Sequence, residues 1–434
     1  MQEIVSMLRS VKISRFKSVR DQSLDFGRVN LFIGGNGTGK SNILEAIGLI
    51  SACLGRGLGD SDIGNKGLRI TPPELMKSSF KNEYLPKTLN LEASFSENIV
   101  YSAVLQSSEN DPLLRIFSES AEHENHRIFG RSNRGVRATG VAHVDRLEKH
   151  RGIWDQIKAT YDLPDVVTNT FSEFSRYVIY TPQTDFLRAK QSGKIDVLPV
   201  GLHGQGLSGA VASFLTEWGR LRRAGESIRK KKGLEHEWRL MDKCSDMVWL
   251  PGWAKEFGTH QGDPRLTSRD VADSTGETVY FFDKFMHSSR NRLSVYDSSE
   301  GTLFLLFAAL ILSHPEAPRV FALDNVDNAL NPKLTRKLVE QILSVVNLTS
   351  QHNTSWGAKQ VFLTSHNPTA LDAIDLFDDE QRVFVVQRND KGHTTTERLK
   401  PKGLTRQDWQ LAVNGRNLSQ VWLDGDIPGA MGDL

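Results

Sequence analysis

Apolar and polar positions along this chain follow two periods, and each period predicts a different kind of element. Residues 29–34 (VNLFIG) form a compact apolar run that ends in glycine, and residues 43–50 then carry apolar side chains at helical spacing. This order predicts a strand, a tight turn and a helix. Residues 89–95 and 99–105 instead alternate with a period of two, which predicts an antiparallel pair joined at 96–98.

The second half of the chain has the pattern of an α/β unit. Residues 278–282 (TVYFF) are typical of a strand, and residues 303–312 are typical of a buried helix. The apolar runs 319–323 and 360–364 are typical of buried parallel strands, and a helical stripe over 334–345 separates them. These patterns predict an α/β protein with a mixed or parallel sheet core, an antiparallel β lobe and a helical insertion.

The same patterns divide the chain into three regions. We expect an N-terminal lobe over residues 1–200, a helical insertion over residues 201–270 and a C-terminal lobe over residues 271–434. The insertion begins with one apolar helix face over residues 207–221, which runs into a basic stretch over residues 220–232.

Composition excludes several classes of protein. Lys and Arg number 54 against 52 Asp and Glu, a net charge of +2, so any surface for nucleic acid or membrane must be local. Two cysteines, Cys53 and Cys244, cannot build a disulfide framework or a cysteine metal cluster. The apolar run 303–312 is about half as long as a membrane-spanning helix, and the N-terminus lacks a signal-peptide pattern. We therefore expect a cytoplasmic protein without a membrane partner.

The clearest chemical motif is a candidate phosphate loop. Residues 34–41 (GGNGTGKS) fit GxxxxGK[ST] directly after a predicted strand and before a predicted helix, a context that argues against a chance glycine-rich turn. Backbone N–H groups of such a loop surround phosphate oxygens, and the helix N-terminus adds partial positive charge. Lys40 is expected to neutralise the β- and γ-phosphates of a nucleotide and Ser41 to ligate Mg²⁺. The predicted nucleotide contacts are Gly34, Asn36, Gly37, Thr38, Gly39, Lys40, Ser41 and Asn42.

Two other strand ends are predicted to face the same site. The apolar strand 319–323 is followed by Asp324, at the carboxyl edge where parallel sheets bind ligands, so Asp324 is a candidate carboxylate beside Mg²⁺. The strand 361–364 is followed by His366, which we expect to face the γ-phosphate. A structural or solvated histidine is the alternative.

Together these segments resemble ABC-type ATPase heads of the RecF/SMC-like branch, a group of bacterial AAA family ATPases. The resemblance follows the order of the whole chain, although the stretch from 55 to 170 matches only in outline. The matching segments are an opening strand at 13–19 (ISRFKSV), the phosphate loop and first helix at 36–47, a degenerate signature motif at 296–302 (YDSSEGT), an acidic strand end and D-loop at 324–332 (DNVDNALNP), and a switch-histidine segment at 364–368 (TSHNP).

The resemblance implies a head-to-tail dimer that holds two ATP molecules between its subunits. In that arrangement the phosphate loop and Asp324 bind the nucleotide of their own subunit, while Ser299 and Gly301 of the opposite subunit contact the γ-phosphate of that nucleotide. Gln183 follows the predicted strand 176–182 and is expected to act as the Q-loop glutamine, on Mg²⁺ or on the attacking water. A surface glutamine is the alternative. The candidate Mg²⁺ ligands are thus Ser41, Asp324 and Gln183.

One position departs from the family pattern. The residue after Asp324 is usually a glutamate that polarises the attacking water, but here it is Asn325, and an amide cannot accept a proton. Phosphoryl transfer depends mainly on positioning and electrostatics, so we expect hydrolysis to be slow rather than abolished. Asp327 is an alternative base. The expectation is firm ATP binding with weak or partner-stimulated turnover.

The resemblance also bears on the biological role. Residues 417–425 (NLSQVWLDG) look like the C-terminal pattern of ATPase subunits in bacterial anti-phage systems of the Septu and retron-associated type, which work with a separate nuclease. Only 68 residues follow His366 (434 − 366), which we expect to be too few for an appended nuclease domain. We therefore expect an oligomeric ATP-gated scaffold or sensor that controls an effector nuclease. The alternatives are a RecF-like DNA-binding ATPase of repair or recombination, which would use the basic stretch from Arg220 to Lys232, and a nucleotide-binding protein without turnover.

Overall fold

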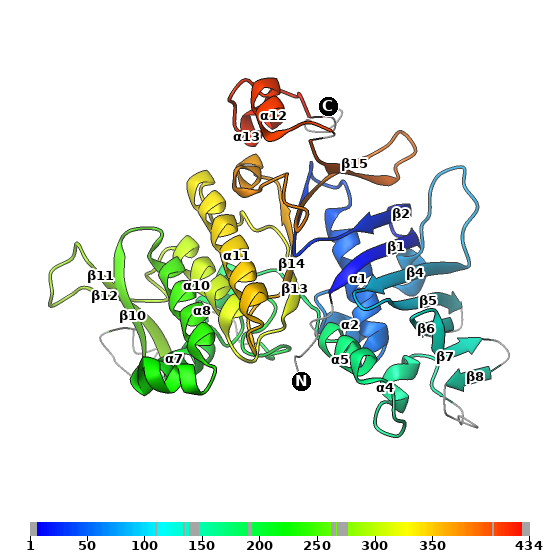
Figure 1. Cartoon of the computed structure of the whole chain (residues 1–434), viewed down its shortest axis with the longest axis horizontal. Coiled ribbons are helices and arrows are strands. Elements are labelled where there is room, and N and C mark those ends of the chain that lie inside the picture. Colours follow the sequence, from blue (N-terminus) through cyan, green and yellow to red (C-terminus); the bar gives the residue numbers. More distant parts are fainter. Residues whose placement is uncertain are drawn as a thin grey trace. The chain divides into compact units, whose positions relative to one another are not determined.

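The computed structural model describes residues 7–108, 111–132, 135–138, 147–189, 193–261, 266, 277–401 and 403–427. The chain forms two compact units. The first unit contains Met1–Ile179, Val320–Asn325 and Gln360–Leu434, and the second contains Tyr180–Arg319 and Val326–Lys359. The first unit is therefore completed by segments far apart in the sequence, drawn mainly in blue to teal and in orange to red in Figure 1.

An antiparallel sheet of seven strands forms one part of the first unit. Its spatial order is β2 (Val19–Asp25), β1 (Leu8–Phe16), β4 (Thr88–Phe95), β5 (Ile99–Ser108), β6 (Asp111–His123), β7 (His126–Ser132) and β8 (Gly135–Ala138). The predicted antiparallel pair is β4 and β5, with Ala93 opposite Tyr101. The sequence patterns name no strand over β6 to β8, where irregular register between β5 and β6 and between β6 and β7 interrupts a strict alternation.

A mixed sheet of six strands forms the rest of the core. Its order is β16 (Thr394–Leu399), β15 (Gln381–Arg388), β3 (Val29–Ile33), β14 (Gln360–Ser365), β13 (Val320–Leu323) and β9 (Ile179–Tyr180). The strands β15, β3, β14 and β13 run parallel, and β16 is antiparallel to β15. The expected α/β fold with a mixed sheet core and an antiparallel lobe is confirmed. The strand predicted over 176–182 is shorter than expected and is limited to the two residues of β9.

Helix α1 (Lys40–Leu54) is the central helix of the first unit. All of its residues except Ser41 and Asn42 are buried, and the buried set includes the charged Lys40 and Glu45. Its apolar side chains share one core with side chains of both sheets. The shorter helices of this unit are α2 (Asp60–Gly64), α3 (Pro73–Met76), α4 (Ile153–Ile157), α5 (Asp165–Phe174), η2 (Pro368–Ala373), α12 (Arg406–Ala412) and α13 (Leu418–Leu423).

The second unit is mainly helical and carries a small antiparallel sheet. Its helices are α6 (Thr184–Leu187), α7 (Leu207–Lys231), α8 (Glu235–Ser245), η1 (Asp246–Trp249), α10 (Glu300–Ser313) and α11 (Pro332–His352). Its sheet has the order β10 (Ala254–Gln261), β11 (Glu277–Asp283) and β12 (Arg292–Ser294). The buried helix predicted over 303–312 is α10. Within the described ranges, no helix has both the length and the apolar character that a membrane span requires.

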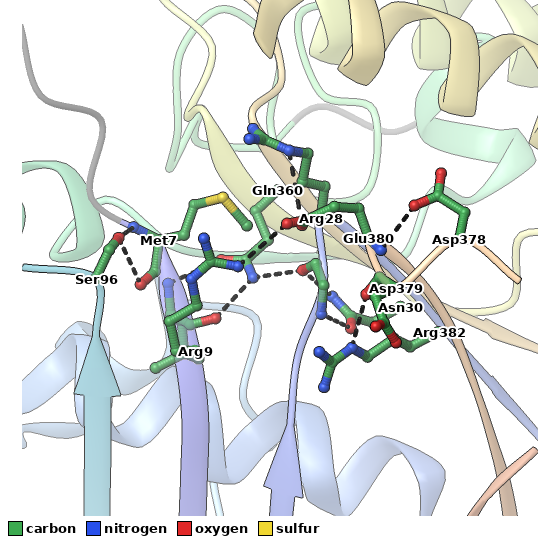
Figure 2. A network of polar contacts seen from close by, with 12 residues as sticks. Met7, Arg9, Arg28, Asn30, Ser96, Gln360, Asp378, Asp379, Glu380 and Arg382 are labelled. Carbon is green, nitrogen blue, oxygen red and sulfur yellow. Dashed lines mark hydrogen bonds and ion pairs between the residues drawn. The ribbon is translucent and has the colours of Figure 1, made fainter. Parts of the chain in front are cut away.

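A polar network fastens the antiparallel sheet to the mixed sheet at the edge where β3, β14 and β15 begin, as Figure 2 shows. Gln360 is fully buried there, and its side-chain Nε2 donates to Leu8 O at 2.8 Å and to Gly27 O at 2.7 Å. Its Oε1 accepts from Leu8 N at 3.1 Å. One amide side chain thus pairs three backbone groups, of which Gly27 O also accepts from Asn30 Nδ2 at 2.9 Å.

Replacement of Gln360 by leucine is expected to destabilise the fold strongly. Gln360→Leu leaves two carbonyls and one N–H buried without this partner, and the expected loss is about 2–4 kcal/mol of the free energy of unfolding. Urea denaturation monitored by circular dichroism measures it. The matched control is Gln351→Leu on the exposed end of α11, with an expected change of about 0.5 kcal/mol or less. Equal effects of the two substitutions would contradict the assignment.

Candidate functional site

The loop between β3 and α1 has a shape that two glycines make possible. A Cβ atom at Gly34 would lie 2.1 Å from the backbone oxygen of Val386 on β15. Gly39, directly before α1, has φ 106°, and a Cβ atom there would lie 2.1 Å from Thr394 Oγ1. Any larger residue at either position would collide with a neighbouring strand, so the loop is held close against β15 and β16.

Lys40 lies at the centre of this loop. It is 5% exposed, and its Nζ donates to Gly34 O at 2.8 Å and to Gly35 O at 2.9 Å. The same Nζ lies 3.2 Å from His366 Nδ1. His366 follows β14, which pairs with β3 in the mixed sheet. The structure therefore brings the predicted lysine and the predicted histidine together, although 326 positions separate them in the sequence.

Asp324 lies beside the same helix end. Ser41 Oγ donates to Asp324 Oδ2 at 2.9 Å, and Thr364 Oγ1 donates to Asp324 Oδ1. Asn325 N donates to Thr364 Oγ1 at 2.8 Å. Strands β13 and β14 are parallel with Leu323 opposite Leu363, which is why Asp324 and Thr364 meet. Thr364 was not predicted as a site residue from the sequence, where its one signal is its place two residues before His366.

A cluster of charges surrounds the first turns of α1. The buried Glu45 accepts from Arg69 Nε at 2.6 Å and also pairs with Lys17. Arg69 Nη2 donates to Asn42 Oδ1 at 2.6 Å. The hydrogen bond with Glu45, assisted by the nearby charges of Glu45 and Asp324, raises the pKa of Arg69. Burial lowers the pKa of Lys17. Arg69 carried no sequence signal, because it lies in a stretch without hydrophobic periodicity.

The other predicted site residues belong to the second unit. Gln183 is exposed and directly precedes α6. Ser299 is the N-cap of α10, where its Oγ accepts from Thr302 N at 3.3 Å. A Cβ atom at Gly301 would lie 3.0 Å from Ala329 O, so this glycine permits a close approach of the segment after β13. Ser299 and Gly301 thus have local structural roles.

Part of the positive charge at the end of α7 is neutralised by acidic side chains of α7 itself and of α8. Arg220 pairs with Glu217, Lys230 pairs with Glu226, and Arg229 is buried. Exposed positive charge remains at Arg222, Arg223, Lys231 and Lys232. The positive surface is therefore smaller than the sequence indicated.

The chemistry of the first unit's side chains fits a polyphosphate with a hard divalent cation. The Ser41 hydroxyl and the Asp324 carboxylate are 2.9 Å apart, and both are oxygen donors of the kind that Mg²⁺ prefers. Lys40 supplies a buried ammonium group next to them at the start of a helix, where an anion is favoured. The cations Lys17, Lys40 and Arg69 outnumber the acids Glu45 and Asp324 around the first turns of α1, which favours an anion there.

Comparison with protein families finds two matches. The family described as "AAA ATPase domain" matches residues 7–193, which contain the phosphate loop. The family described as "AAA domain, putative AbiEii toxin, Type IV TA system" matches residues 255–372, which contain Asp324 and His366. No curated protein matches the sequence.

Several solved structures are distantly similar. The SMC head domain from Thermotoga maritima has 13% sequence identity and a TM-score of 0.43, over 91% of this chain and 99% of that chain. An SmcHead bound to the C-winged helix domain of ScpA has 14% identity and a TM-score of 0.45, with the same coverage. The recombination mediator protein RecF with ATP has 11% identity and a TM-score of 0.37, again with the same coverage.

Proposed function

We propose that this chain is an ATPase that binds ATP in the loop of residues 34–41 and hydrolyses it slowly. The observation that carries the proposal is the meeting of Lys40, Ser41, Asp324 and His366 at one edge of the mixed sheet, from three separate stretches of sequence. The matches to two AAA ATPase domain families support it.

In this proposal each side chain has a defined task. Lys40 exchanges its contacts with the loop carbonyls for the β- and γ-phosphates, and His366 contacts the γ-phosphate. Ser41 and Asp324 would hold Mg²⁺, and the ion would supply positive charge that neutralises the phosphates. Thr364 is a positioning residue, since its hydroxyl fixes the orientation of the Asp324 carboxylate. The role expected for Gln183, on Mg²⁺ or on the attacking water, stays a prediction, because Gln183 belongs to the second unit.

Asn325 keeps the rate of ATP hydrolysis low in this proposal. Its side chain has no group that accepts a proton from water at neutral pH, so the attacking water lacks general-base assistance at this position. Positioning and charge neutralisation continue to favour phosphoryl transfer. The chain is therefore expected to hydrolyse ATP slowly, which suits a switch more than a motor.

We further propose that ATP closes a head-to-tail dimer in which Ser299 and Gly301 of the opposite subunit touch the γ-phosphate. Ser299→Asp tests this contact, because aspartate is also a good N-cap and leaves α10 capped while adding a negative charge near the phosphate. With a non-hydrolysable ATP analogue, sedimentation velocity is expected to show dimers for the native protein and monomers for Ser299→Asp. The control Ser289→Asp, at an exposed loop position, is expected to dimerise normally. Dimers in all three proteins would contradict the contact.

The role favoured for this dimer is an oligomeric scaffold that controls a separate effector nuclease in bacterial anti-phage defence. The support for this role is the resemblance of residues 417–425 to ATPase subunits of such systems. The family matched over residues 255–372 is described as "AAA domain, putative AbiEii toxin, Type IV TA system". Purification from the native host followed by mass spectrometry tests the role. A stoichiometric nuclease whose release depends on ATP supports the scaffold.

The second candidate is a DNA-binding ATPase of repair or recombination. The exposed Arg222, Arg223, Lys231 and Lys232 on and after α7 favour it. If DNA co-purifies without a nuclease, and the affinity for this DNA falls steeply with salt, the DNA-binding ATPase would replace the scaffold hypothesis.

A further inference from the structure

The open face of the antiparallel sheet carries a polar hollow over β5 to β8, in the first unit. In the strand register, Ser102 lies opposite Ser120, Ser120 opposite Gly130, and Gly130 opposite Arg137. Residues directly opposite each other across strands share a face of the sheet, so these positions form one row across four strands. The reverse face is the buried one, where Tyr101, Ala121 and Phe129 pack into the core.

The row across the hollow contains a glycine, Gly130. With no side chain at Gly130, the Arg127 side chain lies across this position, and a Cβ atom at Gly130 would be 3.4 Å from Arg127 Cδ. Around it lies a cavity of about 420 Å³, which is within the size range of small-ligand sites. Its polar lining includes Ser102, Ser118, Ser120, Ser132, Arg127 and Arg137.

The lining of the hollow holds more arginines than acids, with Arg127, Arg131 and Arg137 against Glu119. Among the described lining residues the one acid is Glu119, whose side chain is fully buried and receives hydrogen bonds from Tyr101 and from Ile153 N. Arg127 lies over Gly130, with its Nη2 3.4 Å from Glu122 Oε1, and Arg137 is exposed at the end of the row. Two guanidinium groups therefore flank a floor of serine hydroxyls.

We propose that this hollow binds a small phosphate-bearing ligand. A phosphate group has three strongly accepting oxygens, and the hollow offers hydroxyl and guanidinium donors from several directions. Guanidinium groups pair with phosphate through two parallel hydrogen bonds. The hollow is concave and about as wide as three strand spacings, about 14 Å, which fits a small ester better than an extended polymer. The site is separate from the loop of residues 34–41 and does not depend on the function proposed for that loop.

Isothermal titration calorimetry with ribose 5-phosphate and with inorganic phosphate tests the site. The protein carries Lys40→Ala throughout, so that binding at the phosphate loop does not contribute. Arg137→Gln is expected to weaken binding at least about tenfold, which corresponds to about 1.4 kcal/mol. Gly130→Val fills the floor with a residue that suits a strand and is expected to abolish binding while the melting temperature is kept. The control Arg336→Gln, an exposed arginine on α11, is expected to bind as the parent does.

The two probes distinguish the source of the phosphate. Tighter binding of ribose 5-phosphate indicates a sugar or nucleoside ester, and equal affinities of the two probes indicate free phosphate. Either result supports the site if Arg137→Gln and Gly130→Val remove the binding. Absence of heat with both probes up to about 10 mM, or binding that both variants retain, would overturn the proposal. Binding of a single-stranded oligonucleotide that depends on Arg137, without binding of either small probe, would overturn it in favour of a nucleic-acid surface.

Discussion

Lys40→Ala is expected to weaken ATP binding at least about a hundredfold, a loss of about 2.7 kcal/mol. Lys40 is 5% exposed, and its ammonium group lies between two loop carbonyls and His366, so its charge is held in place for a bound triphosphate. Charge-assisted hydrogen bonds of this kind are among the strongest in proteins. Equilibrium dialysis or calorimetry with a non-hydrolysable ATP analogue measures the change.

The matched control for this substitution is Lys12→Ala. Lys12 is an exposed lysine on β1 that pairs with Glu92 at 2.7 Å, and its removal is expected to leave ATP affinity within about twofold of the native value. If both variants bind the analogue as the native protein does, the loop of residues 34–41 is not the nucleotide site.

Asn325→Glu is expected to raise the rate of ATP hydrolysis at least about tenfold, within the range that general-base catalysis supplies. The native protein is expected to turn over slowly, because the amide of Asn325 cannot take the proton of the attacking water. Steady-state phosphate release at saturating ATP measures both rates.

Asn325→Gln is the control for this gain, because it has the length of glutamate without the carboxylate. It is expected to stay at the native rate. Asn325 has φ 58°, a left-handed conformation that asparagine tolerates better than longer residues, so both variants are expected to lose about 1 kcal/mol of stability. Fast native hydrolysis that Asn325→Glu does not increase, or an equal increase in Asn325→Gln, would contradict the role of Asn325.

The sequence predicted the parts of the site in which the pattern is local. The strand, turn and helix over residues 29–50 follow from an apolar run, a glycine-rich loop and a helical stripe. Asp324 and His366 were found because each directly follows an apolar strand, and the parallel order of β13, β14 and β3 then brings these strand ends to one edge.

Features that depend on register or on distant pairing were not predictable from one sequence. Thr364 orients Asp324 only because β13 and β14 pair with Leu323 opposite Leu363. Gln360 looks like a polar end to an apolar run, yet it pairs backbone groups of Leu8 and Gly27, more than 300 positions away. The hollow at Gly130 likewise appears only when four strands are placed in register.

The most direct test of the account is a crystal structure of the native protein with Mg²⁺ and a non-hydrolysable ATP analogue. We expect a triphosphate enclosed by residues 34–41, with Lys40 Nζ within about 3 Å of a phosphate oxygen and with Ser41 and Asp324 beside the metal. A nucleotide bound elsewhere on the chain, or crystals grown in excess analogue with that loop empty, would contradict it.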